Sequence, residues 1–427
     1  RNGLNMQMEP LYQTGKDVQK EAETIHADAW LVGLYYLCLP LTFITLLPGM
    51  SALKAVTFPI AGFLALYRLL PQSRKICLNS VHLFYTLQLL FMAGTLLFYR
   101  GPESATVVKD VSLALLVTLL ATCRVYNQAE RRLFSRIWLL VGLICMLLCL
   151  FSKKAIDGGR TVIVVLGSEE DPNFFCMYFI FPVLFALESL TRKTKFRFLT
   201  VPYLILVFYA ILRTGSRGGL AAILAGVLAF IFLAIRSPKA RLSALLLLLL
   251  VALVILFIVL PLLPEAVRQR YSPAQIWEDQ GSGRFPIWSY LLTQVCSDAS
   301  SLIHGFGICS TIPHMTAAGF QNTYAHNQWI QTLFDQGLIG LFLYAALMGA
   351  CFFRNLRRNP LFSCGLVAVW GFSLSLSLYT HKQYLNVFMM CAMSFAPPEM
   401  ADLQKGGTLL SQPFLPSREP LRKEEGD

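Results

Sequence analysis

Long runs of hydrophobic residues, separated by short polar turns, dominate the chain between residues 30 and 396. Most runs have roughly 18 to 23 residues, the length that a helix needs to cross a ~30 Å hydrocarbon core. Irregular backbone cannot face lipid, because its polar groups would lack hydrogen-bond partners there. The pattern therefore predicts an all-α, polytopic transmembrane helix bundle of about twelve spans, at residues 30–47, 52–70, 77–99, 105–123, 134–151, 172–190, 196–213, 217–235, 242–263, 327–353, 361–379 and 382–396.

Basic residues concentrate in every second turn between these runs. The turns after the even-numbered runs are short and nearly free of acids, and they contain Arg68, Arg74, Lys75, Arg124, Arg131, Arg132, Arg136, Arg192, Lys193, Lys195, Arg197, Arg236, Lys239, Arg241, Arg354, Arg357 and Arg358. By the positive-inside rule these turns are cytoplasmic. The alternate loops, which have mixed charge, then lie outside, and both chain ends are cytoplasmic.

This orientation divides the chain into five segments. Residues 1–29 are a cytoplasmic N-terminal segment, 30–263 contain spans one to nine, and 264–326 form one large periplasmic or extracellular loop. Residues 327–396 contain spans ten to twelve, and 397–427, rich in Pro, Gly and charged residues, form a disordered cytoplasmic tail. The chain opens with Arg1 rather than methionine, so we expect the true start to lie upstream.

The composition agrees with a membrane protein. Hydrophobic residues make up 56% of the chain and charged residues 14%, with a mean hydropathy of +0.57. A soluble domain is nearer a quarter charged. The net charge of +12 arises mainly from the cytoplasmic basic turns, which suit an anionic inner leaflet. The expected partner is therefore the lipid bilayer, and no nucleic acid is needed to explain the charge.

Cysteines and histidines give no metal-site pattern. Most of the eleven cysteines lie in apolar runs, as small buried hydrophobic residues do. Cys296 and Cys309 share the outer loop, and the sequence does not decide whether they form a disulfide. The same loop contains His304, His314 and His326, at spacings of ten and twelve residues. These spacings match no compact ligand motif, so we expect no metal.

His326 stands where the outer loop meets the tenth run. It directly precedes Asn327 and a helix predicted to extend to about residue 353. An imidazole with a pKa near 6.5 can accept or donate a proton at neutral pH. The helix N-terminus beside it offers backbone N–H groups to an anion. The alternative is that His326 is only an amphipathic anchor at the membrane interface.

Glycine-flanked segments place arginines on the outer side as well. Arg213 and Arg217 lie in the sequence Arg-Thr-Gly-Ser-Arg-Gly-Gly, whose glycines permit a sharp turn and close approach to a ligand. Arg284 follows Gly-Ser-Gly and precedes an amphipathic stretch with Pro286 and Trp288, which predicts a short helix in the membrane plane. Guanidinium groups bind phosphate bidentately. The alternative is that these arginines extend to lipid headgroups or to water.

Two other segments carry structural expectations. Asp171-Pro172-Asn173 predicts a helix start, with aspartate as the N-cap and proline at the first helical position. The run from Ala244 to Leu260 is almost pure Leu, Val and Ala, which indicates a lipid-facing span.

Three motifs resemble those of the O-antigen ligase and Wzy-type polymerase superfamily. Thr-Gly-Ser-Arg-Gly-Gly-Leu at 214–220 is similar to its first core motif, and Gly283-Arg284 with Trp288 to its second. The third is similar to its histidine motif and comprises His326, Asn327, Gly337 and Gly340. A further glycine of the ligase pattern would fall at Leu343, and the polymerase RX10G pattern is absent. The resemblance therefore leaves ligase and polymerase open.

The resemblance implies a glycosyltransferase that moves a glycan from a polyprenyl-diphosphate carrier to an acceptor hydroxyl. The reaction occurs at the outer face of the cytoplasmic membrane, without metal, nucleotide or other cofactor. Arg217, Arg284 and Arg213 would bind the diphosphate, and His326 would deprotonate the acceptor or assist the leaving phosphate. Asn327, Gly337 and Gly340 would set the helix start and its packing. Neither the sugar nor the lipid- or glycan-linked acceptor is specified.

Two other classes fit less well. Protein-glycosylating transferases that use lipid-linked sugars need an acidic pair in the first outer loop, and residues 48–54 contain no acid. A transporter or flippase would favour ionisable groups at mid-membrane and internal repeats. The strongest polar motifs here lie at the outer edge instead, and the chain shows no internal repeat.

Overall fold

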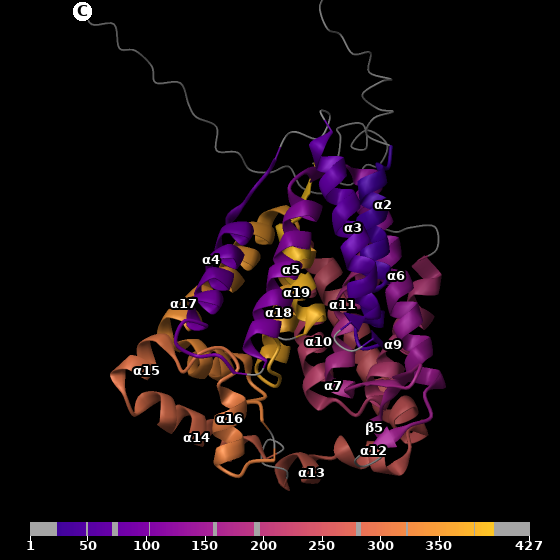
Figure 1. Cartoon of the computed structure of the whole chain (residues 1–427). Coiled ribbons are helices and arrows are strands. Elements are labelled where there is room, and N and C mark those ends of the chain that lie inside the picture. The colour runs from indigo at the N-terminus through magenta and orange to yellow at the C-terminus, as the bar shows by residue number, and fades with distance from the viewer. Residues whose placement is uncertain are drawn as a thin grey trace, which may run out of the picture.

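The computed structural model describes residues 24–47, 50–70, 76–101, 103–156, 160–191, 197–278, 283–321, 323–379 and 381–396. Over these residues the chain is a bundle of helices with four small two-stranded sheets (Figure 1). The all-α class is therefore confirmed. Each of the twelve predicted runs contains a helix, whereas the number of membrane crossings remains a prediction.

The main helices are α2 (Ala27–Leu37), α3 (Ala52–Leu69), α4 (Ser80–Thr95), α5 (Ser104–Thr122), α6 (Gln128–Phe151), α8 (Ile180–Thr191), α9 (Arg197–Arg213), α10 (Arg217–Ala229), α11 (Pro238–Val254), α17 (Gln328–Arg358), α18 (Pro360–Ser373) and α19 (Lys382–Ala392). Shorter helical segments are η1 (Leu39–Leu41), α7 (Pro172–Phe175), η3 (Cys176–Phe179), η4 (Phe230–Ala234), η5 (Ile255–Val259), η6 (Leu260–Leu262), α12 (Glu265–Arg270), α13 (Pro273–Glu278), α14 (Arg284–Cys296), α15 (Ala299–His304) and α16 (Thr311–Ala317).

The strands form short pairs. Antiparallel pairs join β1 (Thr45–Leu47) to β2 (Met50–Ser51), β4 (Ala155–Ile156) to β5 (Arg160–Thr161), and β6 (Ile163–Val165) to β7 (Ser168–Glu170). One parallel pair joins β3 (Val125–Tyr126) to β8 (Ser394–Phe395). After β7, Asp171 caps α7 by accepting a hydrogen bond from the Asn173 N–H at 2.7 Å, which confirms the predicted helix start.

Within the described residues, seven helical segments are long and apolar enough to cross a membrane: 52–69, 104–122, 128–151, 172–191, 217–234, 238–262 and 328–358. Large apolar side chains stay exposed along them, and Phe257, for example, is 70% exposed. Such faces suit hydrocarbon rather than water, so the chain is a multi-pass membrane protein. No residue of α11 is buried, as a lipid-facing span requires.

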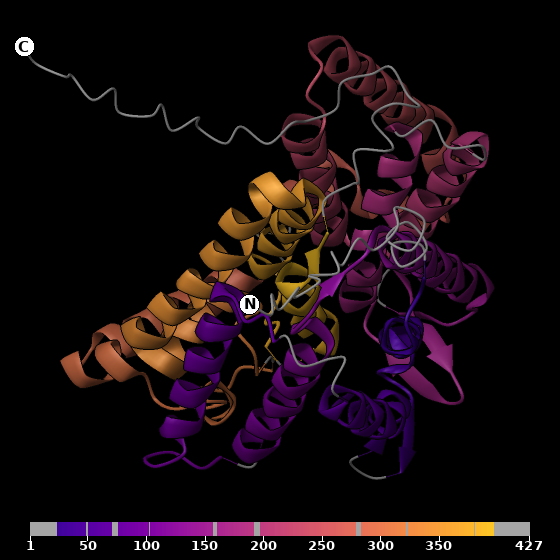
Figure 2. The same cartoon turned by 90° about the horizontal axis from the view of Figure 1, so that it is seen from above.

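The late helices link the two sides of the bundle. Figure 2 shows α19, in yellow, between the violet and the magenta helices, while α17, in orange, lies toward one edge beside violet α4. α17 packs along α4 and α18, and α18 packs along α10. Helices α12 to α16 gather at one end, which we call the loop end (Figure 1). The opposite end, where α2 begins and α5 and α17 finish, contains Arg68, Arg124 and Arg354, and we call it the basic end.

The first turns of α17 hold the loop end together through buried polar side chains. The amide oxygen of Gln328 accepts from the backbone N–H groups of Leu378 and Tyr379, and that of Gln331 accepts from the Ala325 N–H. The carboxylate of Asp335 accepts from the backbone N–H groups of Cys309 and Thr311 and from the side chains of Ser310, Thr311, Gln331 and Tyr379. These bonds attach the segments before and after α17 to one helix.

Gly337 allows this attachment. Its φ is +61°, and a Cβ there would lie 2.4 Å from the carbonyl carbon of Ile303. The contact lies between α17 and the end of α15, whereas a Cβ on Gly340 would meet the side chain of Gln336 in its own helix. Gly337 therefore permits close packing of the loop rather than of another long helix.

The two loop cysteines do not pair. Cys296 is exposed and Cys309 is buried, and both are free thiols. Cys309 instead donates its backbone N–H to Asp335, so it forms part of the attachment of the loop.

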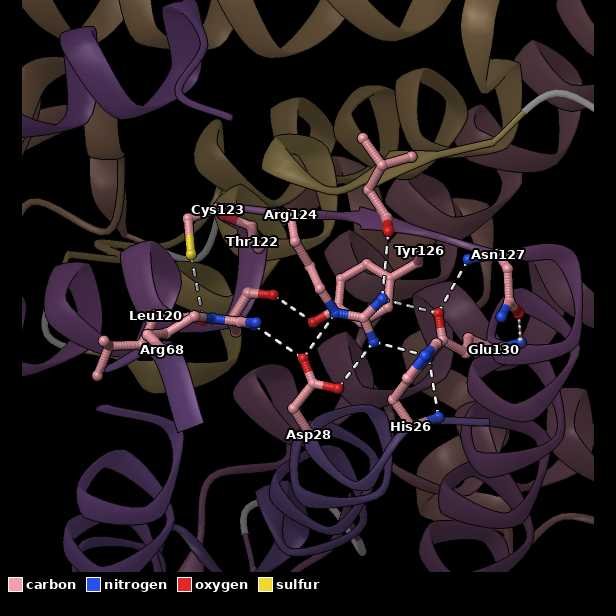
Figure 3. Close-up of polar contacts among 12 residues, drawn as sticks. His26, Asp28, Arg68, Leu120, Thr122, Cys123, Arg124, Tyr126, Asn127 and Glu130 are labelled. Carbon is pink, nitrogen blue, oxygen red and sulfur yellow. Dashed lines mark hydrogen bonds and ion pairs between the residues drawn. The ribbon is translucent and has the colours of Figure 1, made fainter. Parts of the chain in front are cut away.

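An ionic cluster closes the basic end (Figure 3). The guanidinium of Arg124 lies between two fully buried carboxylates, contacting Asp28 at 2.6 and 2.8 Å and Glu130 at 2.7 and 3.0 Å. Arg68 reaches Asp28 at 2.9 Å, and His26 reaches Glu130 at 2.8 Å. Each buried carboxylate thus has a cationic partner, and the cluster joins α2, α3, α5 and α6.

We expect Arg124→Gln to destabilise the protein strongly. Removing this guanidinium deprives Asp28 and Glu130 of their shared partner, and breaking such a buried pair costs about 3–5 kcal/mol. The exposed Arg132, changed to Gln, is the matched control. Thermal unfolding in detergent measures both variants, and equal midpoints would contradict the structural role of the cluster.

The orientation predicts the reactivity of two thiols. Cys296 is exposed at the loop end and should react with a membrane-impermeant maleimide in intact cells, with Cys296→Ser as the blank. Ser237→Cys, introduced together with Cys296→Ser, should react only after permeabilisation, because Ser237 is the N-cap of α11 at the basic end. The opposite pattern would reverse the orientation.

Candidate active site at the loop end

The turn between α9 and α10 is a compact polar loop. The Thr214 hydroxyl donates to the carbonyl of Ile211 at 2.6 Å and accepts from the Ser216 N–H at 3.2 Å. The Ser216 hydroxyl caps α10 by accepting from the Gly219 N–H at 3.1 Å. Gly215 has a φ of +64°, a conformation that favours glycine. Because the turn is fixed in this way, Arg217 becomes the first residue of α10.

Two arginines that the sequence analysis did not select contact this turn. The Nε atom of Arg160, in β5, donates to the carbonyl of Thr214 at 3.3 Å. The Nε atom of Arg270, in α12, donates to the carbonyl of Gly215, also at 3.3 Å. Both lie on outer segments of the predicted topology, where an arginine runs against the positive-inside trend. That signal could have identified them, although neither lies in a recognisable motif.

Arg213 takes a different position. Its Nη1 atom donates to the carbonyl of Leu150 at 2.9 Å, at the end of α6. This contact ties α9 to α6, so the structure gives Arg213 a bracing role and provides no contact to the turn's carbonyls.

His326 has a strained backbone. Its φ is +47°, in the left-handed region that few residues other than glycine adopt. Its neighbours hold it there: the indole N–H of Trp288 donates to the carbonyl of Ala325 at 2.8 Å, and the Ala325 N–H donates to Gln331 at 2.9 Å. The side chain of Asn327 donates to the carbonyl of Leu374 at 3.4 Å. Trp288 lies in α14, so the helix that begins at Arg284 helps to fix the backbone conformation of His326.

The start of α17 differs from expectation in one respect. The side-chain oxygen of Asn327 accepts from the N–H groups of Trp329 and Ile330, at 3.0 and 3.2 Å. These donors are therefore already used and are not available to an anion. Asn327 itself acts as the N-cap, which explains its place beside His326.

The charges around His326 favour its neutral form. Burial lowers the pKa of the imidazole most, and the positive charge of Arg284 lowers this pKa further, whereas the negative charge of Asp171 opposes them. A neutral imidazole is the form that accepts a proton. These effects also place Arg284 and Asp171 within electrostatic reach of His326.

The starts of α10 and α17 meet at the turn after α18. Asn327 bonds to Leu374, and a Cβ on Gly218 would lie 2.8 Å from the Ser375 hydroxyl. Arg217, the first residue of α10, therefore lies on one side of this turn. His326, whose pKa the charge of Arg284 lowers, lies on the other side, before α17. Nearby, the half-buried ring of His381 stacks on the ring of Phe174, with 3.4 Å between the ring centroids. The structure thus gathers residues separated by more than a hundred positions at one end of the bundle.

The other loop histidines have local partners. His304 bonds to Ser300 at 2.7 Å, and His314 bonds to the carbonyl of Ser310 at 2.8 Å while packing against Phe334. In the part of the chain that the structure describes, no three His, Cys, Asp or Glu side chains gather as a metal site.

A protein-family model described as O-antigen ligase matches residues 202–345. The matched segment extends from α9 into α17 and includes Arg217, Arg284 and His326. The match confirms the resemblance to the O-antigen ligase and Wzy-type polymerase superfamily. A comparison with curated proteins found no match.

The charges predict opposite pKa shifts in two variants. Arg284→Gln removes a positive charge and should raise the pKa of His326, whereas Asp171→Asn removes a negative charge and should lower it. Asparagine retains the N-cap of α7, and Arg268→Gln is the control with no expected shift. ¹⁵N NMR of histidine-labelled protein, assigned with His326→Gln, measures the titration. Shifts of the same sign in both variants would contradict the assignment.

Proposed function

We propose that this chain, which carries an O-antigen ligase domain at residues 202–345, moves a glycan from a polyprenyl-diphosphate carrier to an acceptor hydroxyl. Transfer takes place at the outer face of the cytoplasmic membrane, where the loop end would lie. The family match supports a membrane enzyme of polysaccharide biosynthesis. The lipid-linked donor, the acceptor and the roles of individual residues are parts of the proposal.

The observation that carries the proposal is the setting of His326. The residue is held in a strained conformation between two hydrogen-bonded neighbours, with a lowered pKa and with Arg284 in electrostatic reach. Backbone strain at a polar residue is typical of a site where geometry is fixed for chemistry. An interfacial anchor would need neither the strain nor the nearby guanidinium.

In the proposed reaction the neutral imidazole of His326 accepts the proton of the acceptor hydroxyl. The acceptor oxygen forms a bond to the anomeric carbon, while the bond from that carbon to the diphosphate oxygen breaks. The carrier diphosphate leaves with the electron pair, and Arg217 and Arg284 stabilise its growing negative charge. A single attack opposite the leaving group inverts the anomeric configuration.

The proposed chemistry needs no metal or nucleotide. The departing lipid diphosphate is already a good leaving group, and fixed guanidinium groups supply the positive charge that a metal would otherwise provide. A polymerase of the same superfamily would use these residues identically, with a second lipid-linked repeat unit as acceptor. The acceptor alone separates the two activities.

Substitution of His326 tests the proposed base. His326→Ala should reduce transfer in proteoliposomes by roughly 10²–10⁴-fold, because a general base contributes that factor. His326→Lys supplies a positive charge but cannot accept a proton while protonated, so it should not restore transfer. His304→Ala, in the same loop, is the control and should retain activity.

Three outcomes would contradict this proposal. Full transfer by His326→Lys would reduce the residue to a phosphate anchor, and nearly full transfer by His326→Ala would remove it from the mechanism. Loss of activity in the presence of a chelator would show that the reaction needs a metal and would contradict the metal-independent mechanism.

A further inference from the structure

Two arginines converge on Gly215 from separate parts of the chain. Arg160 comes from the β4–β5 hairpin and Arg270 from α12, and their Nε atoms bond to the consecutive carbonyls of Thr214 and Gly215. Both side chains are therefore fixed near their Nε atoms. These two contacts place both residues at the turn from which α10 begins, with Arg217 as its first residue.

The absence of a side chain at Gly215 makes room for this pair. A Cβ there would lie 2.9 Å from the Cγ of Arg160 and 3.4 Å from the Cδ of Arg270. The φ of +64° also disfavours any other residue. The turn therefore leaves room for the aliphatic parts of two arginine side chains.

Arg160 is buried, and within the described part of the chain no acid pairs with it. The residue is only 9% exposed, and its Nη2 atom has no hydrogen-bond partner among the residues that the structure describes. Among the described residues it forms no ion pair with an acid, in contrast to the paired arginines of the basic end. A buried guanidinium without an anion is costly, and an anionic ligand removes that cost.

Arg217 shares this environment. Burial raises the pKa of the Tyr271 phenol, while the positive charges of Arg270, Arg160 and Arg217 each lower that pKa. Three guanidinium groups therefore lie within electrostatic reach of one side chain. The Tyr271 hydroxyl itself is occupied, donating to the carbonyl of Leu212 at 3.1 Å.

We propose that Arg160 and Arg270 form a clamp for a phosphate group of the carrier lipid's diphosphate, beside Arg217. The clamp rests on the proposed function, and it adds the orientation in which the lipid-linked donor binds. α12 follows the apolar segment 238–262, so the clamp lies close to the hydrocarbon region that the carrier chain occupies. The carrier end of the donor then binds at α10 and α12, and its glycan extends toward His326 and α14.

The two arginines of α12 provide a matched test. Arg270→Gln and Arg160→Gln should each weaken binding of farnesyl diphosphate to the detergent-solubilised protein on the order of 10-fold or more, because each removes a charge-assisted contact. Arg268→Gln should leave the Kd unchanged, since Arg268 is paired with Glu265 at 2.8 Å. Arg270 is only half-buried, so its variant should fold even if Arg160→Gln does not.

Inorganic diphosphate and farnesyl monophosphate complete the experiment. The clamp predicts that farnesyl diphosphate binds more tightly than either, and that both clamp variants reduce its preference over farnesyl monophosphate. Wild-type affinity in Arg270→Gln and in folded Arg160→Gln would overturn the clamp; if Arg217→Gln still lost binding, the proposed function would stand. Equal affinity for inorganic diphosphate would mean that the pair binds a free anion and would overturn the carrier assignment.

Discussion

The loop end of this protein depends on one constraint, which is that polar groups buried at the start of α17 must all find hydrogen-bond partners. Gln328, Gln331 and Asp335 lie on the same helix and are fully or almost fully buried. Their partners come from residues 309–311 and 325 before the helix and from 377–379 after α18. An unpaired group here would cost several kcal/mol, roughly 2–7 for an amide or hydroxyl. These bonds therefore fix the segment that contains His326.

The two ends of the bundle use arginine in different ways. At the basic end, Arg124 pairs with the buried carboxylates of Asp28 and Glu130, and Arg68 pairs with Asp28. At the loop end, Arg160 is buried and forms no ion pair with an acid of the described ranges, and its Nη2 atom has no partner there. The first arrangement holds four helices together. The second is the basis of the proposed phosphate clamp, which lies beside Arg217, one of the arginines that the family resemblance suggests for phosphate binding.

The fold was largely predictable because the length of an apolar run can be read directly along the sequence. A helix that crosses lipid must be apolar over a fixed length. The histidine and the turn at Arg217 were also accessible, since glycine and polar residues at the edges of apolar runs mark them. Arg160 and Arg270 were not selected, although their position on outer segments was a usable signal; their contacts with the turn form only where three distant segments meet at Gly215. The role of Asn327 at the helix start was predicted, whereas its occupation of the Trp329 and Ile330 N–H groups was not, because that depends on a side-chain rotamer.

The most direct measurement follows one turnover of the purified protein in liposomes, with a polyprenyl-diphosphate-linked glycan of defined anomeric configuration and a hydroxyl acceptor, in the presence of a chelator. NMR of the product and quantification of the released lipid report the two bonds that change. The proposed mechanism predicts an inverted anomeric centre and one polyprenyl diphosphate released for each glycan transferred. Retention of configuration, or release of polyprenyl monophosphate, would contradict a single displacement of the diphosphate by the acceptor.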